Sequence, residues 1–228
     1  MSALEFPLEQ SWAKGLRIEF CDREESQKYS LENTFHLKQV HGDRCFKWVE
    51  SWPTNPPPEA DAIWVDSQEF RNQKKPLLIK TADCLPIFFI DHQKQSLIAM
   101  HAGWRGVQKE LPFLPFKEKW CDPKSTWIWV GPSLSGKSFV VKEDMWSQFP
   151  KNISDNPKYF ERDLLNTDQR FFHVWKYVED RWKSLGVELV YNVEVNTFEN
   201  ENFSSWRRDF KAGLTKPASN NYSLLWPT

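Results

Sequence analysis

Two short apolar runs joined by a polar segment constrain the fold of this chain more than any other feature. Residues 85–90 and 96–100 are rich in Ile, Leu and Phe, and Asp-His-Gln-Lys-Gln separates them at 91–95. Runs of this length beside a turn-like segment predict two antiparallel strands in a hairpin. Cys84 precedes the first run and His101 follows the second. The hairpin would therefore bring a thiol and an imidazole close together.

Other segments predict further strands and two helices. The strand predictions rest on alternation or on short apolar runs, at 16–20, 60–65, 76–80, 126–130, 138–141, 187–195 and 222–226. The longest predicted helix follows Thr167, where Phe171, Trp175, Val178, Trp182 and Leu185 recur at helical spacing before Gly186. A shorter helix is expected near 143–149, and the proline-rich segment 52–58 is expected to be a loop.

The order of these elements predicts the fold class. Strands and helices are interspersed without a regular βαβ rhythm, which favours an α+β protein with mixed or antiparallel β-sheets packed between helices. The length of 228 residues and a hydrophobic content of 40% suit one packed domain over 1–228. The thirteen tryptophans show no repeat period, so they are expected to fill the core and stack on the surface rather than to form a cofactor site.

Charge and cysteine content exclude several classes of protein. With 30 basic and 31 acidic residues the net charge is −1, so no basic surface for nucleic acid or an anionic membrane is expected. The four cysteines form no CxxC pair, which disfavours a disulfide scaffold and fits a reducing compartment. No signal-like N-terminus or long apolar window is evident. We therefore expect a soluble cytoplasmic protein, either a monomer or a homodimer.

Three residues form a candidate metal site, namely His41, Cys84 and His101. Each histidine is followed within two residues by a glycine, which permits a tight turn and leaves the imidazole accessible. Three nitrogen and sulfur ligands leave a fourth position for water or substrate, as in catalytic zinc sites. We expect zinc rather than copper, because a multicopper cluster needs further histidines and the chain has five in total.

The same residues allow two other hypotheses. In a metal-free hydrolase, Cys84 would be a nucleophile activated by His101, with Asp83 or another carboxylate orienting the imidazole. A third histidine, His41, is superfluous to such a pair and useful to a metal, which favours zinc. The second alternative is a catalytically silent protein that keeps the metal for stability. The remaining histidines, His36, His92 and His173, lack a comparable context, and we expect structural roles for them.

A series of six motifs resembles the YfiH-like family. In order, the motifs are QVHG at 39–42, ADA at 60–62, TADCLP at 81–86, HAGWRG at 101–106, GPSLSG at 131–136 and SWRRD at 205–209. That family was first labelled multicopper polyphenol oxidase, or laccase domain, and is now regarded as purine nucleoside phosphorylase. The resemblance covers about 39–226 and leaves 1–38 as a divergent N-terminal part. TADCLP followed by HAGWRG is its most specific element.

The resemblance implies both an activity and a set of site residues. It implies a YfiH-like fold and phosphorolysis of adenosine, inosine, guanosine and methylthioadenosine, with an accompanying adenosine deaminase activity. Its substrates would be a purine nucleoside and phosphate. The implied zinc ligands are His41, Cys84 and His101, which would be catalytic together with Arg105. Arg207 and Arg208 are guanidinium groups suited to bind substrate or phosphate.

Three features depart from the motifs of the family. Residues 17–38 contain no glycine where relatives carry an Arg-Gly-Gly-rich segment, and 195–198 replace a late cysteine motif. Ser138 stands where relatives commonly have cysteine. The zinc ligands are unaffected, so the departures predict altered specificity or lost turnover rather than loss of metal. The group that protonates the leaving purine is left open among three acids, Asp61, Asp83 and Glu143.

Overall fold

The predicted hairpin lies at the centre of the fold. In the computed structural model, which describes residues 4–7, 15–48 and 56–227, β7 (Leu85–Asp91) pairs antiparallel with β8 (Ser96–Ala102). The first four residues of the loop expected at 52–58 lie outside the described residues. A six-stranded sheet extends from the hairpin in the order β13-β9-β7-β8-β5-β4. The other strands of this sheet are β13 (Leu189–Asn192), β9 (Thr126–Val130), β5 (Ala62–Asp66) and β4 (Cys45–Lys47).

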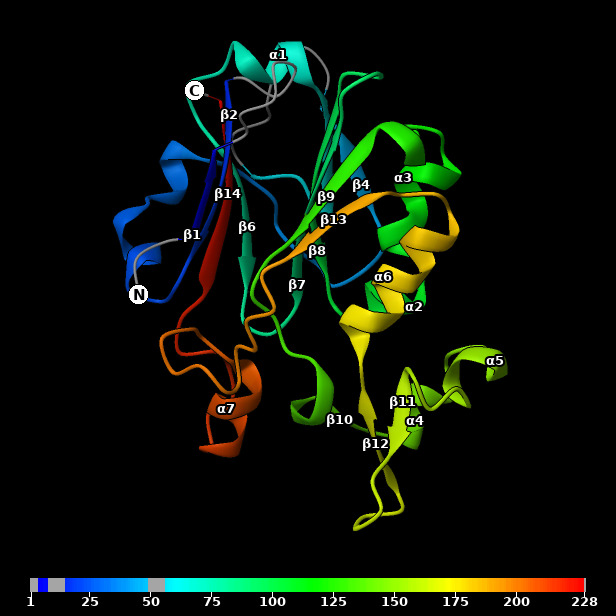
Figure 1. Ribbon diagram of the computed structural model, residues 1–228. Coiled ribbons are helices and arrows are strands. Elements are labelled where there is room, and N and C mark those ends of the chain that lie inside the picture. The colour runs from blue at the N-terminus through cyan, green and yellow to red at the C-terminus, as the bar shows by residue number, and fades with distance from the viewer. Residues whose placement is uncertain (1–3, 8–14, 49–55, 228) are drawn as a thin grey trace.

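Both faces of this sheet are covered (Figure 1). Every residue of β7 and β8 is buried, as expected for strands packed on two sides. Phe88 faces a five-stranded sheet of order β1-β2-β14-β6-β3. Phe89 faces the helical side, where its ring meets that of Trp182 edge to face with the ring centroids 5.8 Å apart. The strands of the second sheet are β1 (Leu4–Pro7), β2 (Leu16–Cys21), β14 (Asn221–Pro227), β6 (Leu77–Thr81) and β3 (Phe35–His36).

The helices are short. Several of them gather on the face of the six-stranded sheet that lies opposite the five-stranded sheet. Those that pack there are α2 (Trp104–Gln108), α3 (Leu114–Lys117) and α6 (Val174–Ser184). The remaining helices are α1 (Ser67–Arg71), α4 (Glu143–Trp146), α5 (Lys151–Ser154) and α7 (Trp206–Lys211). The predicted mixed α+β fold is therefore confirmed. Within the described ranges, no helix has the length and apolar character needed to cross a bilayer.

A small third sheet and several 3-10 turns complete the chain. The sheet has the order β10-β12-β11 and consists of β10 (Val140–Lys142), β12 (Gln169–Phe172) and β11 (Phe160–Arg162). The 3-10 turns are η1 (Glu25–Lys28), η2 (Leu31–Asn33), η3 (Leu111–Phe113), η4 (Pro123–Ser125) and η5 (Gly136–Ser138).

The longest predicted helix begins later than its apolar spacing indicated. Phe171 lies in β12 and pairs with Val140 of β10, so the strand partners available to this segment outweigh its helical periodicity. α6 starts at Val174, and His173, predicted to lie within the helix, is its N-cap. The predicted end is correct, because Gly186 adopts a left-handed φ of 96° just after the helix.

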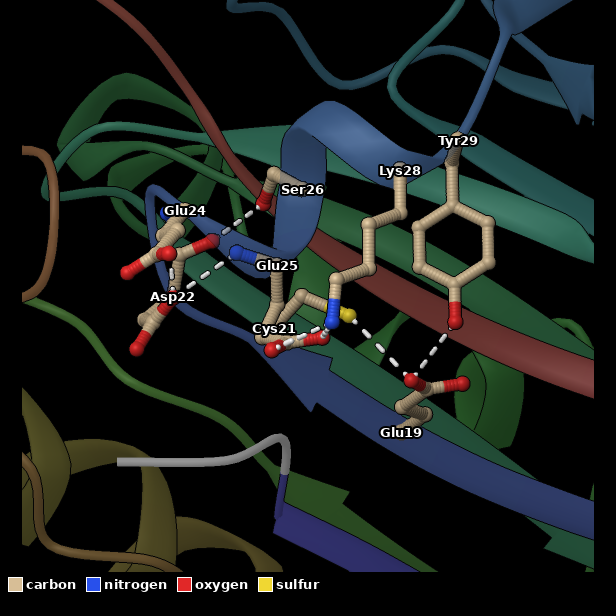
Figure 2. A network of polar contacts seen from close by, with 8 residues as sticks. All are labelled: Glu19, Cys21, Asp22, Glu24, Glu25, Ser26, Lys28 and Tyr29. Atoms are coloured by element: carbon tan, nitrogen blue, oxygen red, sulfur yellow. Dashed lines mark hydrogen bonds and ion pairs between the residues drawn. The ribbon is translucent and has the colours of Figure 1, made fainter.

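The described part of residues 1–38 supplies β1, β2 and β3 of the five-stranded sheet, and polar side chains between Glu19 and Tyr29 form a hydrogen-bonded network there (Figure 2). Glu19 of β2 is 3% exposed, yet its carboxylate accepts hydrogen bonds from the Tyr29 hydroxyl at 2.7 Å and the Cys21 thiol at 3.5 Å. The indole of Trp226 on β14 donates to the same carboxylate at 2.9 Å. A buried charge is tolerated when it is hydrogen-bonded in this way. The glycine-free segment is thus held by hydrogen bonds among its own polar side chains and to Trp226 of β14.

Substitution of Gly131 tests the packing between the two large sheets. A Cβ atom at this position would overlap the ring of Phe20 and lie 2.8 Å from Cγ of Pro86. We expect Gly131→Ala to lower the free energy of unfolding by about 1–3 kcal/mol, the usual cost of overpacking a core. Urea denaturation followed by tryptophan fluorescence measures this change. The double variant Phe20→Leu/Gly131→Ala should lose less than the sum of the two single changes, and strict additivity would contradict the predicted clash.

Candidate metal centre

The strand order brings four chain segments to one edge of the six-stranded sheet. Antiparallel pairing places the start of β7 beside the end of β8, and the end of β8 beside the start of β5. β4 runs parallel to β5, so the loop that precedes it enters at the same edge. Cys84, His101 and Asp61 therefore converge there, and His41 arrives from the loop before β4. The predicted hairpin is confirmed, and it brings the thiol of Cys84 and the imidazole of His101 close together as expected.

The three predicted metal-binding residues form one cluster. The potential ligand atoms of His41, Cys84 and His101 all lie within 4.8 Å of one another. The two imidazole rings meet edge to face, with centroids 4.7 Å apart. His101 is buried, Cys84 is half-buried and His41 is exposed, so the cluster opens toward solvent on one side. Two nitrogen donors and one sulfur donor fit a zinc ion that keeps an open position.

Gly103 provides space beside the cluster. A Cβ atom at this position would lie 3.2 Å from Sγ of Cys84 and 3.7 Å from Cδ2 of His41. The backbone of Gly103 has φ −73° and ψ 169°, which any residue can adopt. Glycine is therefore needed here for space rather than for conformation, which gives the first glycine of the motif HAGWRG a physical explanation.

A buried carboxylate contacts the ring of His101 and the backbone of His41. Asp61 is fully buried, and its Oδ1 lies 2.8 Å from Nδ1 of His101. The backbone N–H of His41 donates to Oδ1 at 2.9 Å, and that of Gly42 donates to Oδ2 at 2.7 Å. Burial alone would raise the pKa of Asp61, but these hydrogen bonds hold it below the usual value. The sequence left the carboxylate that orients His101 open between Asp83 and another acid, and the structure places Asp61 beside the ring instead of Asp83.

Because ionised Asp61 only accepts hydrogen bonds, Nδ1 of His101 must be the donor. In the neutral ring, the other nitrogen, Nε2, then carries the lone pair that can bind a metal or accept the thiol proton. Metal-binding histidines commonly have such a carboxylate partner on the opposite ring nitrogen. The local chemistry of His101 therefore suits a metal ligand or a catalytic base better than an ordinary core histidine.

Cys84 differs electrostatically from the other cysteines. Burial opposes ionisation, but the neighbouring imidazoles of His101 and His41 outweigh it and lower the pKa of the Cys84 thiol. Burial likewise lowers the pKa of His101, yet the Cys84 sulfur and Asp61 raise it above the usual value. In contrast, burial raises the pKa of Cys45 and of Cys121 to about 12. Cys84 is thus suited to be a thiolate ligand or nucleophile.

Asp83, next to Cys84, connects the cluster to α7. Its backbone has a φ of 92°, in a region that L-residues rarely adopt. Its carboxylate accepts hydrogen bonds from the Thr197 hydroxyl at 2.7 Å and from the backbone N–H of Arg207 at 2.6 Å. Its carbonyl oxygen accepts a hydrogen bond from the N–H of Leu134 at 2.8 Å. Asp83 therefore fixes the loop before β7 against two distant segments.

A cavity of about 450 Å³ opens beside Cys84. Its walls carry four aromatic rings and two cations, from Trp104, Phe139, Trp206, Phe210, Arg207 and Lys211. The sequence analysis did not single out these rings. The positions of Trp104 and Trp206 inside the motifs HAGWRG and SWRRD were the available signal. Flat apolar walls with cations between them suit a planar ring that carries or accompanies an anion.

The three predicted anion-binding arginines have different environments. Arg207 lines the cavity, and its guanidinium donates to the carbonyl oxygen of Val140 at 2.8 Å without an ion pair among the described residues. Arg105 is exposed, and its guanidinium carbon lies 4.5 Å above the ring of Trp104. Arg208 does not line the cavity. Its guanidinium donates to three backbone carbonyls, those of Thr197, Phe198 and Phe203.

The other histidines lie outside the cluster. All five histidines of the chain belong to the described residues, and two of them are in the cluster. Nε2 of His173 lies 2.9 Å from the Glu161 carboxylate, and Nδ1 of His36 lies 3.3 Å from the Thr34 hydroxyl. His92 belongs to the turn between β7 and β8. The chain therefore does not gather the histidines that a multicopper cluster requires.

Known proteins resemble this chain in sequence. A purine nucleoside phosphorylase of Haemophilus influenzae is 29% identical over 189 residues, which are 82% of this chain and 74% of the relative. A protein named purine nucleoside phosphorylase YfiH, from Shigella flexneri, is also 29% identical, over 182 residues that cover 78% of this chain and 69% of the relative.

Solved structures share the fold at lower identity. A Neisseria meningitidis protein superposes with a TM-score of 0.76 at 20% identity and covers 100% of this chain and 99% of its own. Bacillus licheniformis YfiH superposes with a TM-score of 0.73 at 15% identity and covers 100% and 97%. The sequence model of the family described as multi-copper polyphenol oxidoreductase laccase matches residues 21–215. The chain therefore belongs to this laccase-like family, which the YfiH resemblance of its motifs had indicated.

Proposed function

We propose that the protein is a zinc-dependent purine nucleoside phosphorylase. The observation that carries the proposal is the cluster of His41, Cys84 and His101 at the edge of a cavity with aromatic and cationic walls. The names of the sequence relatives support this reaction class. The proposed substrates are adenosine, inosine, guanosine and methylthioadenosine. Phosphate would cleave the first three to the free base and ribose 1-phosphate, and the last to adenine and 5-methylthioribose 1-phosphate.

In this proposal the three clustered residues hold zinc. The ion would supply Lewis-acid chemistry at an open coordination position, where it can polarise a substrate oxygen or nitrogen or acidify water. Zinc is preferred to copper because one thiolate and two imidazoles match a tetrahedral site with one free position. Adenosine deamination, which needs an activated water, belongs to the same proposal.

The chain's own residues would bind and orient the two substrates. The rings of Trp104, Phe139 and Trp206 offer flat surfaces against which a purine can stack. Arg207 would bind phosphate, because it is a cation that lines the cavity and Asp83 fixes its backbone N–H. Arg105 would assist the anion from the rim. Arg208 is kept as a more remote candidate, since its donors already bind carbonyl oxygens.

A second candidate function rests on a specific observation. Cys84, His101 and Asp61 form a thiol–imidazole–carboxylate series, with 2.8 Å between the ring nitrogen and the carboxylate. Without metal, this series has the nucleophile, base and orienting acid of a cysteine hydrolase. It ranks below the phosphorylase because it gives no role to His41. The third hypothesis, a silent zinc protein, requires the same metal and differs only in turnover.

Removal of the thiolate ligand tests the metal centre. Cys84→Ala should lose the bound zinc and more than about 100-fold of phosphate-dependent base release, because a sulfur ligand is deleted outright. Elemental mass spectrometry and a purine-release assay on inosine measure the two effects. Cys45→Ala is the matched control and should keep both. Stoichiometric zinc in the Cys84 variant would contradict the assignment of this ligand.

Replacement of the two neighbouring arginines separates phosphate binding from structural support. Arg207→Gln should raise the KM for phosphate and lower kcat/KM by about 10–100-fold, the usual loss for a charged hydrogen bond. Arg208→Gln should instead lower the melting temperature, because it frees three backbone carbonyl oxygens. Steady-state kinetics with varied phosphate and thermal unfolding distinguish the two. An unchanged KM for phosphate in the Arg207 variant would exclude its proposed role.

A further inference from the structure

We infer that Asp61 is the positioning residue of the metal centre, which sets the ring nitrogen that His101 presents and the backbone conformation that presents His41. The inference rests on the zinc site of the proposed function. Asp61 does not line the cavity, so it would act through the two histidines and not on the substrate. Its contacts with both histidines are what distinguish it from an ordinary buried carboxylate.

Asp61 makes hydrogen bonds with both histidines. Oδ1 faces two groups at once, the ring Nδ1 of His101 and the backbone N–H of His41, at 2.8 and 2.9 Å. The carbonyl oxygen of Asp61 also accepts a hydrogen bond from the backbone N–H of His101 at 2.7 Å. Both histidines are thus tied to one residue that precedes β5. A displacement of Asp61 would move the two nitrogen donors relative to the sulfur of Cys84.

The conformation of His41 depends on this carboxylate. Its φ of 57° lies in the left-handed region, which costs a residue with a Cβ atom about 1–3 kcal/mol. In this conformation the successive N–H groups of His41 and Gly42 point at the same carboxylate, at 2.9 and 2.7 Å. The two charge-assisted hydrogen bonds stabilise the otherwise unfavourable turn. His41 is exposed, so packing alone would not hold its imidazole toward the cluster.

The conservative variant Asp61→Asn separates positioning from simple packing. Asparagine has nearly the same shape but only one acceptor oxygen, so it cannot satisfy all three N–H donors. If its oxygen accepts from the N–H of Gly42, its amide nitrogen takes the place of Oδ1, where it faces the N–H of His41 and donates to Nδ1 of His101. That contact favours the tautomer with the proton on Nε2, which is the wrong one for a ligand at that atom.

The experiment compares zinc affinity in the full-length wild type, Asp61→Asn and the control Asp91→Asn, by competition with a chromophoric chelator. Asp91 is equally buried, and its Oδ1 likewise accepts loop N–H groups, those of Gln93 and Lys94 at 2.9 and 3.0 Å. We expect zinc affinity to fall about 10–100-fold in Asp61→Asn and to stay unchanged in Asp91→Asn. The visible spectrum of the cobalt-substituted protein should change only in Asp61→Asn.

Equal zinc affinity and an unchanged cobalt spectrum in Asp61→Asn would overturn the inference while leaving the proposed function intact. A wild type that binds no zinc would overturn both. If Asp61→Asn does not fold, nitrogen-15 NMR of zinc-loaded wild type with labelled histidine gives the answer. A proton on Nδ1 of His101 is the expected result, and a proton on Nε2 would refute the inference.

Discussion

The carboxylate of Asp61 is the interaction on which the arrangement of the site depends. It is fully buried, so its charge is tolerated only because three N–H groups point at its two oxygens. Those three groups belong to the loop that carries His41 and to the ring of His101. The hydrogen bonds that this buried carboxylate needs in the folded protein are therefore the same ones that position the two histidines. A chain that satisfies this carboxylate has also placed two imidazoles next to each other.

The central hairpin explains why polar chemistry gathers at one edge of the sheet. β7 and β8 are buried on both faces, so their middle positions must be apolar and cannot hold exposed reactive groups. Reactive side chains are confined to the strand ends, where Cys84 precedes β7 and His101 lies one residue before the end of β8. Asp83 then attaches α7 and its Arg207 to the same edge. The proposed metal ligands and the cationic wall of the cavity therefore lie at the same edge of the sheet.

The sequence predicted the parts of this structure that depend on local pattern. The hairpin followed from two apolar runs and a turn, and the cluster of His41, Cys84 and His101 followed from their places at strand ends and in motifs. The start of α6 was predicted wrongly, because Phe171 has helical spacing but pairs with β10 in space. The role of Asp61 was not predictable either, since its partners depend on which strands lie side by side. Arg207 and Arg208 are adjacent in sequence, and only the fold shows that one faces the cavity and the other binds carbonyl oxygens.

In the proposed function, one metal centre and one neighbouring cavity carry out phosphate-dependent cleavage of a nucleoside. The most direct measurement is the release of base and ribose 1-phosphate from inosine by the purified wild type, with and without phosphate, before and after chelation and zinc readdition. The account predicts ribose 1-phosphate only when both phosphate and zinc are present. Base release that needs no phosphate and survives chelation would contradict it and would favour the hydrolase formed by Cys84, His101 and Asp61.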